Sequence, residues 1–165
     1  MMNRPIENSY WVVPERLLAG EYPGSQRPED ARAKVGTLLH AGVTAFVDLT
    51  EEGELEPYSD LVAPALHHRF PIRDISVPES TDQMVRILDT IDGYVNQGGL
   101  VYVHCWGGVG RTGVVIGCWL ARRSGGREAL RMLWELWKGC PKSSSRQSPE
   151  TPKQESYILD WRAGA

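Results

Sequence analysis

The amino-acid sequence predicts a single α/β domain over residues 1–165, with a central, mostly parallel sheet of four to five strands and helices on both faces. Short apolar runs typical of buried strands alternate with segments that carry apolar residues at helical spacing. Such alternation is typical of a sheet that is covered on both faces. The 165 residues, 41% of them hydrophobic, suffice for one full core, and neither an internal repeat nor a second domain is evident.

The first half of the chain predicts four strands and two helices. Short strands at 10–13 and 17–20 flank a turn, a helix follows at 28–40, and buried strands are expected at 43–49 and 66–72. Apolar residues recur at helical spacing over 81–97, and Ser80 or Thr81 is the expected N-cap. These apolar positions are Met84, Ile87, Leu88, Ile91 and Val95.

The second half predicts one strand and three helices. The apolar run 100–103 predicts a buried strand, and residues 112–120 predict an apolar helix. After a break at 124–126, apolar residues fall on one face of a helix at 127–138. Residues 141–147 are polar and loop-like, and Ser148-Pro149-Glu150 predicts the start of a last helix that ends near Trp161.

Composition excludes several classes of protein. A net charge of −3 and a pI near 5.8 argue against nucleic acid or an anionic membrane as a partner held by bulk electrostatics. No apolar run is long enough to span a bilayer, and residues 1–13 lack the pattern of a signal peptide, so the cytoplasm is the expected location. Three cysteines, an odd number, do not indicate a disulfide framework.

The segment 104–113, His-Cys-Trp-Gly-Gly-Val-Gly-Arg-Thr-Gly, joins a predicted strand to a predicted helix. Glycines at 107, 108 and 110 admit dihedral angles closed to other residues, so the backbone N–H groups can wrap around an anion. The N-terminus of the following helix favours both a dianion and a thiolate at Cys105. Arg111 adds a planar fork that can hold two phosphate oxygens. The segment is therefore a candidate phosphate-binding loop with its own nucleophile.

The pattern His-Cys-x5-Arg-Thr resembles the signature of the cysteine-dependent protein tyrosine phosphatase superfamily, and the dual-specificity phosphatases in particular. A second stretch, Phe70-Pro71-Ile72-Arg73-Asp74-Ile75-Ser76-Val77-Pro78, resembles the general-acid loop of that family, with Asp74 thirty-one residues before Cys105. The two motifs are independent and stand in the expected order. The likeness covers about residues 10 to 140.

The resemblance implies one catalytic domain that hydrolyses phosphomonoesters. Cys105 is the expected nucleophile, Arg111 holds the phosphate and Asp74 protonates the leaving group. Thr112 is expected to help release the Cys105 thiolate, and His104 is expected to orient the loop. The other residues expected to bind substrate are Trp106, Gly107, Gly108, Val109 and Gly110, although packing beneath the loop is the favoured placement of the Trp106 side chain.

The same resemblance implies a monomer that needs no metal and no cofactor. Its partner is then a phosphorylated protein or another phosphomonoester. His67 and His68 are adjacent on a predicted strand and point to opposite faces, so they make a poor metal pair.

Other polar residues near the motifs are weaker candidates. Asp82 and Glu79 are lesser alternatives to Asp74 as the acid. Arg69 and Arg73 lie near the acid loop, where they either attract an anionic substrate or are solvated surface residues. The resemblance implies that Gln154 can approach the site and position the hydrolytic water, as a late glutamine does in some relatives, but it is expected to face solvent on the last helix.

The remaining cysteines, Cys118 and Cys140, are expected to be structural. A reversible disulfide between one of them and an oxidised Cys105 is a hypothesis, since the sequence does not place their Cα atoms.

Several functions stay open at this stage. Nothing resembles the tyrosine-recognition loop of the larger tyrosine-specific enzymes, which favours a shallower pocket and dual specificity. Relatives that act on phosphoinositides often place lysine in this loop to bind the additional phosphates. Residues 106–110 contain no lysine, so a phosphoinositide substrate is less favoured. A sulfurtransferase needs no general acid on a separate loop, and an arsenate reductase of the small-phosphatase type carries its signature near the N-terminus. A binding module without turnover does not need the complete catalytic set. A phosphatase of the same chemistry that acts on a small molecule, a nucleotide or an RNA 5′ end remains an alternative.

Overall fold

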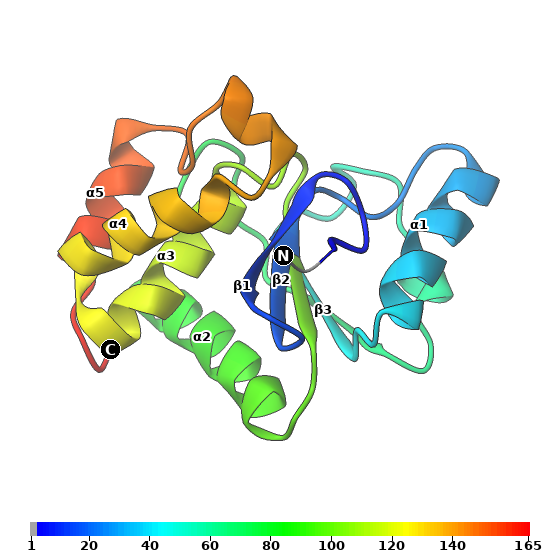
Figure 1. Ribbon diagram of the computed structural model, residues 1–165, viewed down its shortest axis with the longest axis horizontal. Coiled ribbons are helices and arrows are strands. Elements are labelled where there is room, and N and C mark those ends of the chain that lie inside the picture. The colour runs from blue at the N-terminus through cyan, green and yellow to red at the C-terminus, as the bar shows by residue number, and fades with distance from the viewer. Residues whose placement is uncertain (1–2) are drawn as a thin grey trace.

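The computed structural model describes residues 3–165. Its centre is a five-stranded sheet in the order β1-β2-β5-β3-β4 (Figure 1). The strands are β1 (Ser9–Val13), β2 (Leu17–Gly20), β3 (Ala45–Asp48), β4 (Leu66–Arg69) and β5 (Val101–His104). β1 runs antiparallel to β2, whereas all other neighbours are parallel. The predicted mostly parallel sheet is therefore confirmed as a mixed sheet with one antiparallel edge strand.

Helices cover both faces of this sheet, as predicted. Helix α1 (Pro28–His40) packs on one face, and α2 (Thr81–Asn96), α3 (Arg111–Ser124), α4 (Gly126–Trp137) and α5 (Pro152–Asp160) pack on the other. Alternate strand residues point to opposite faces: Phe46 and Tyr102 lie in the core with α1, while Val47 and Val103 lie in the larger core. Two single turns of 3-10 helix, Ser59–Leu61 and Pro141–Ser144, complete the order.

Several boundaries differ from the sequence prediction. The strand expected at 43–49 spans only Ala45–Asp48, and the helix expected at 112–120 continues to Ser124. The strand expected at 66–72 ends at Arg69, although the N–H groups of Phe70 and Ile72 still bond to Asp48 and Leu49. Pro71, which has no N–H donor, interrupts the ladder there. The last helix begins at Pro152 instead of near Ser148, because Thr151 caps it and Gln154 completes a capping box. The segment 141–147, expected as a loop, contains the second 3-10 turn.

Small residues on α3 let the C-terminal segment come very close. A Cβ atom at Gly113 would lie 2.2 Å from the Ser148 hydroxyl oxygen, and one at Gly117 would lie 2.3 Å from Ile158 Cδ1. The chain after α4 therefore passes directly over the start of α3. This close approach brings residues 142–154 to the loop that follows β5.

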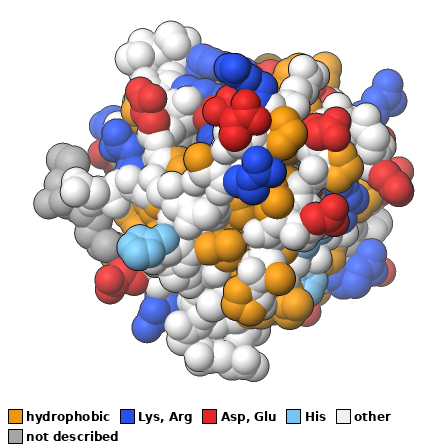
Figure 2. All heavy atoms as spheres, turned by 90° about the vertical axis from the view of Figure 1, so that its right-hand side faces the viewer, with side chains coloured by type: hydrophobic (Ala, Val, Ile, Leu, Met, Phe, Trp, Pro, Cys, Tyr) orange, Lys and Arg blue, Asp and Glu red, His pale blue; other side chains and the backbone are white. Residues whose placement is uncertain are grey.

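The surface carries charges of both signs. Figure 2 shows the face over α1, where Lys and Arg side chains alternate with Asp and Glu and apolar side chains lie in small groups. Within residues 3–165, no helix combines the length and the apolar character that a membrane span requires.

Candidate active site

The loop between β5 and α3 has the wrapped form that its glycines predicted. Cys105 follows the strand directly and is 3% exposed, and Arg111 is the first residue of α3. Gly108 has a φ of +75°, and a Cβ atom there would lie 2.5 Å from the backbone carbon of Gly20. The N–H of Tyr22 also donates to the carbonyl of Trp106 at 2.9 Å. The end of β2 thus holds the loop from one side, at a distance only glycine permits.

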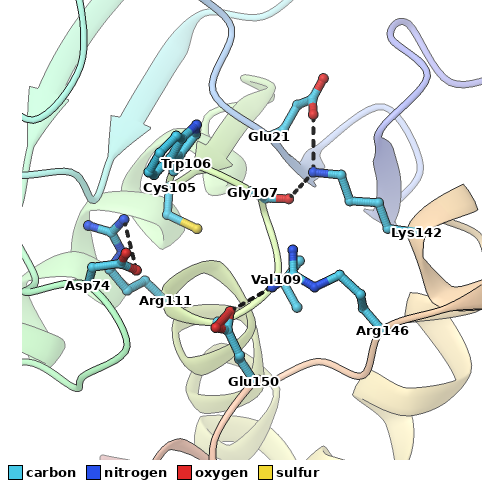
Figure 3. A pocket seen from close by; sticks show the side chains of 11 residues that line it. Glu21, Asp74, Cys105, Trp106, Gly107, Val109, Arg111, Lys142, Arg146 and Glu150 are labelled. Atoms are coloured by element: carbon cyan, nitrogen blue, oxygen red, sulfur yellow. Dashed lines mark hydrogen bonds and ion pairs between the residues drawn. The ribbon is translucent and has the colours of Figure 1, made fainter.

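A pocket of about 310 Å³ lies over Cys105 (Figure 3). Four separate segments meet in it: the loop after β5, the acid loop with Asp74, the residue after β2, and the chain between α4 and α5. Of the five residues predicted to take part in the chemistry, Cys105, Arg111 and Asp74 line it. Thr112 and His104 do not, and neither do the alternative acids Asp82 and Glu79. Its lining residues are Glu21, Asp74, Cys105, Trp106, Gly107, Val109, Gly110, Arg111, Lys142, Arg146 and Glu150.

The Arg111 side chain is almost completely buried, and hydrogen bonds fix its position. Its Nη1 and Nη2 groups donate to the two carboxylate oxygens of Glu54 at 2.8 and 2.7 Å, and Nη1 also donates to the carbonyl of Ile72 at 3.0 Å. The Asp74 carboxylate lies 3.3 Å from Nη2. The two terminal nitrogens of the fork that was expected to hold phosphate oxygens thus both bind Glu54. Nε of Arg111 is buried and has no partner among the described residues.

Glu54 was missed in the sequence. It lies in a loop with other acidic residues, and no pattern distinguishes it from them. The hydrogen bond from Arg111 lowers the pKa of Glu54, against the opposing effect of partial burial. The carboxylate therefore stays charged and fixes the orientation of the guanidinium.

The acid loop is anchored at both ends by glutamine side chains. Gln83 Nε2 donates to the carbonyl of Pro71 at 2.8 Å, and Gln154 Nε2 donates to that of Ser76 at 2.9 Å. Between them, the Asp74 carboxylate accepts the N–H of Ile75 at 2.9 Å, and Ile75 has a φ of +55°. The two anchors and this turn place Asp74 at the pocket wall.

The expectation that Gln154 faces solvent is wrong. Its side chain is fully buried, and Oε1 accepts the N–H groups of Glu150 and Thr151 at 3.0 and 3.1 Å. The close packing of α5 on α3 turns this residue inward, where it lies within 3.1 Å of the Cβ position of Gly110. Gln154 therefore connects the acid loop, the start of α5 and the phosphate-binding loop.

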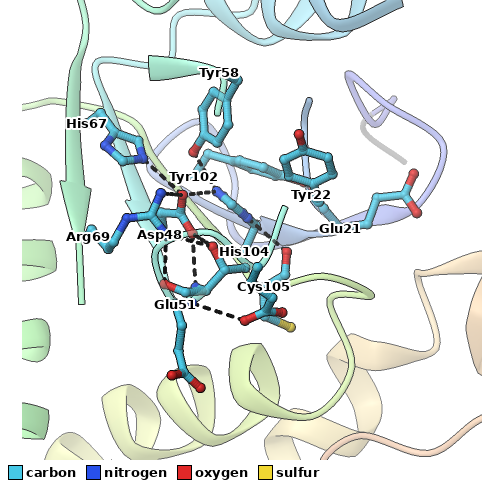
Figure 4. Close-up of polar contacts among 12 residues, drawn as sticks. Glu21, Tyr22, Asp48, Glu51, Tyr58, His67, Arg69, Tyr102, His104 and Cys105 are labelled. Carbon is cyan, nitrogen blue, oxygen red and sulfur yellow. Dashed lines mark hydrogen bonds and ion pairs between the residues drawn. The ribbon is translucent and has the colours of Figure 1, made fainter. Parts of the chain in front are cut away.

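His104 supports the loop from behind, inside the core (Figure 4). Its Nδ1 lies 2.9 Å from the carbonyl of Cys105, and its Nε2 lies 2.5 Å from the Tyr58 hydroxyl. Burial lowers the pKa of His104, although the nearby Asp48 charge opposes this effect. A neutral imidazole that donates from Nδ1 accepts a hydrogen bond from the Tyr58 hydroxyl at Nε2. The expected orienting role of His104 fits this geometry.

Asp48 is a second residue that sequence reasoning missed. Its carboxylate accepts bonds from the Thr50 N–H and hydroxyl at 2.9 and 2.6 Å, and lies 2.9 Å from His67 Nε2. Burial by itself would raise the pKa of Asp48, but the bonds from His67 and Thr50 and the nearby His104 lower it well below its usual range. A carboxylate in an otherwise apolar strand was the signal that could have found it.

Several weaker candidates now have defined places. Arg69 donates to the Thr50 carbonyl and lies 3.6 Å from Asp48, so it does not face the pocket. Arg73 lines a separate hollow beside Asp74. His67 and His68 point to opposite faces as predicted, since His68 bonds to the Tyr94 hydroxyl at 2.7 Å.

Trp106 does not pack beneath the loop, contrary to the favoured placement. The side chain is 58% exposed, and Val109 fills the core position under the loop instead. Figure 3 shows the indole at the mouth of the pocket, beside Cys105. Trp106 thus borders the entrance that a substrate has to use.

The three remaining candidates with a hydroxyl or thiol group, Thr112, Cys118 and Cys140, are buried. Among the described residues, Oγ1 of Thr112 has no hydrogen-bond partner, which leaves it free for a group in the loop. Cys118 and Cys140 are both free thiols, and burial raises the pKa of each. Their environment fits the structural role expected for them.

Comparisons with known proteins show the family of this chain. Residues 22–125 match the family model described as a polymorphic toxin system DSP-PTPase phosphatase. A candidate tyrosine phosphatase, 067L of invertebrate iridescent virus 3, is 33% identical over 121 residues, which cover 70% of this chain and 47% of that protein. The human dual specificity protein phosphatase CDC14C is 29% identical over 137 residues, 75% of this chain and 28% of that protein. The chain thus spans about half or less of the length of these two relatives.

Solved structures show the same fold. The active form of Tk-PTP is 26% identical and superimposes with a TM-score of 0.75, covering 93% of this chain and 95% of that one. PTPMT1, crystallised with PI(5)P, is 17% identical with a TM-score of 0.69 over 92% of this chain and 93% of that one, which shows the fold alone. The chain belongs to the dual-specificity phosphatase-like members of the protein tyrosine phosphatase superfamily.

Proposed function

We propose that this chain hydrolyses phosphomonoesters on proteins, phosphotyrosine and also phosphoserine and phosphothreonine, through a phosphocysteine on Cys105. The observation that carries the proposal is the position of Cys105 at a pocket whose walls bring Arg111 and Asp74 to the same place. The family supplies the reaction class, that of a phosphatase, and the pocket supplies a nucleophile, an anion-binding site and an acid.

In the first step, the Cys105 sulfur attacks phosphorus and the bond to the leaving oxygen breaks. Loop N–H groups and the guanidinium of Arg111 hold the charged oxygens, while Asp74 gives its proton to the departing oxygen. Glu54 keeps Arg111 aligned but takes no proton. Because the guanidinium is already fixed by three acceptors before substrate arrives, little reorganisation is needed during the reaction.

In the second step, water attacks the phosphocysteine and the bond from sulfur to phosphorus breaks. Asp74, now a carboxylate, accepts the proton of that water. The thiolate of Cys105 leaves, and the unpartnered Thr112 hydroxyl is available to stabilise it by donating a hydrogen bond. The neutral His104 keeps the carbonyl of Cys105 in place through its Nδ1–H.

The experiment is hydrolysis of p-nitrophenyl phosphate and of one alkyl phosphate in the presence of a chelator and a thiol reductant. Wild type is compared with Cys105→Ser and Asp74→Ala, and Asp82→Ala is the matched control because that residue lies outside the pocket. We expect turnover in wild type and in the control, none in Cys105→Ser, and a loss of about 100-fold or more on alkyl phosphates in Asp74→Ala.

The outcomes separate the rival functions. Turnover retained in Cys105→Ser contradicts the nucleophile assignment. A folded wild type that binds phosphate analogues without any turnover points to a binding module. Faster turnover of nucleotides, RNA 5′ ends or phosphoinositides than of phosphopeptides contradicts the protein substrate but leaves the chemistry intact.

A further inference from the structure

The pocket over Cys105 contains two cations that do not belong to the phosphate-binding loop. Lys142 comes from the 3-10 turn after α4, and Arg146 follows it (Figure 3). The Lys142 ammonium donates to the carbonyl of Gly107 at 2.8 Å, and a Cβ atom on Gly107 would lie 3.5 Å from Arg146 Nη1. Taken alone, two cations beside the loop would favour a substrate with a second phosphate.

Each of these cations is paired with a carboxylate that lines the same pocket. Lys142 Nζ lies 3.2 Å from Glu21 Oε2, and Arg146 Nη2 lies 2.9 Å from Glu150 Oε1. Figure 3 shows both pairs at the pocket wall opposite Asp74. A substrate with a second phosphate would need unpaired positive charge beside the loop. The two carboxylates neutralise that charge.

Glu21 is fixed in its charged form. Its other oxygen lies 3.1 Å from Lys34 Nζ, and Oε2 also accepts from Asn8 at 3.2 Å. Partial burial by itself would raise the pKa of Glu21, but Lys34 and Lys142 lower it below its usual range. At neutral pH this carboxylate is therefore a permanent part of the pocket.

The surroundings of the mouth add further negative charge. A second hollow shares Asp74 and Trp106 with the pocket and is lined by Glu51 and Glu52, with Arg73 as its cation. The loop N–H groups and Arg111 attract the first phosphate. A second anionic group finds cations that are already paired, together with nearby carboxylates that repel it.

We propose that Glu21 and Glu150 determine specificity: by neutralising Lys142 and Arg146, they restrict the pocket to phosphopeptides whose neighbouring residues are uncharged or basic. Substrates that carry a second phosphate or acidic neighbours are disfavoured. The inference rests on the proposed function, and it names the class of substrate for that same site.

The test compares phosphotyrosine peptides of identical length with flanking lysines, flanking glutamates or a second phosphotyrosine. We expect wild type to prefer the lysine peptide over each of the others by about tenfold in kcat/KM, with a smaller preference in high salt. Glu150→Gln should reduce this ratio several-fold, and Glu21→Gln should do the same. Glu29→Gln is the control, because Glu29 is an exposed residue of α1 with the same change in charge.

The possible failures are distinguishable. The inference is overturned if wild type prefers the acidic or the doubly phosphorylated peptide. It is also overturned if the preference for the lysine peptide, as a ratio of kcat/KM values, is the same in Glu150→Gln as in Glu29→Gln. Glu21 has several contacts, so Glu21→Gln can destabilise the fold. If that variant unfolds, Glu150→Gln alone tests the inference. p-Nitrophenyl phosphate, which has no charged neighbour, is measured in parallel. Its hydrolysis shows that the chemistry is intact, and a wild type unable to hydrolyse it refutes the proposed function and this inference with it.

Discussion

Replacing Gln154 by glutamate changes one contact between the acid loop and α5 and leaves the others in place. Oε1 can still accept the N–H groups of Glu150 and Thr151, so the helix cap survives. The second oxygen of the new carboxylate then stands where Nε2 donated, 2.9 Å from the Ser76 carbonyl. A favourable hydrogen bond becomes a repulsion between two acceptors.

The size of the effect follows from burial. Gln154 is fully buried, so the substitution removes a bond that contributes about 1 kcal/mol and desolvates a charge facing a carbonyl, which costs about 2 kcal/mol more. We expect the free energy of unfolding to fall by about 3 kcal/mol. Protonation of the new carboxyl restores a donor, so the deficit should shrink as the pH falls. Displacement of the acid loop should also lower kcat/KM for alkyl phosphates by about tenfold.

The assays are denaturant unfolding followed by tryptophan fluorescence, and kcat/KM for one alkyl phosphate and one p-nitrophenyl phosphate substrate. Gln147→Glu is the control, because it makes the same chemical change at an exposed position in the same segment. An equal loss on both substrates would refute the acid-loop argument, since only the poor leaving group needs the proton of Asp74. Equal destabilisation by Gln147→Glu would refute the energetic argument.

Three further substitutions probe the loop and its support. Gly108→Ala should lower kcat/KM at least 100-fold because its Cβ meets the backbone of Gly20, whereas Gly98→Ala, at a φ of +84° in open space, should cost only about 1 kcal/mol of stability in denaturant unfolding. Thr112→Ala should slow phosphoenzyme breakdown more than its formation, so a stopped-flow burst should grow; an unchanged burst contradicts the role. Asp48 has a pKa below its unfolded value of about 3.9, so it stabilises the fold above that pH and this stability is lost as the pH falls. Asp48→Asn should therefore give unfolding free energies that vary less with pH below about 4, as measured by denaturant titration at several pH values.

The local chemistry of the site was predictable from the sequence. An apolar run, a cysteine, glycines and an arginine at the start of a helix predict a strand, an anion-binding loop and a helix, because each property depends on near neighbours in the chain. Gly108 adopts the positive φ that this pattern anticipated. Asp74 was placed by its own short motif, and the structure brings it to the same pocket.

Residues that act across long sequence separations were not predictable. Glu54 reaches Arg111 over 57 residues, and Gln154 reaches Ser76 over 78. Neither has a distinguishing neighbour in the sequence, and their partners depend on how the loops and α5 pack. The placement of Trp106 failed for the same reason, since competition with Val109 for the space beneath the loop is decided in three dimensions.

The sequence by itself determined the alternation of strands and helices and the glycine-rich loop that begins with Cys105, because periodicity and glycine chemistry act over a few residues. Only the tertiary structure decided which side chains surround that loop. The close packing of α5 on Gly113 and Gly117 carries Gln154 to the acid loop and Glu150 to the pocket. Glu21 and Glu150 then form ion pairs with Lys142 and Arg146, and pairing of charges is a property of the folded chain alone.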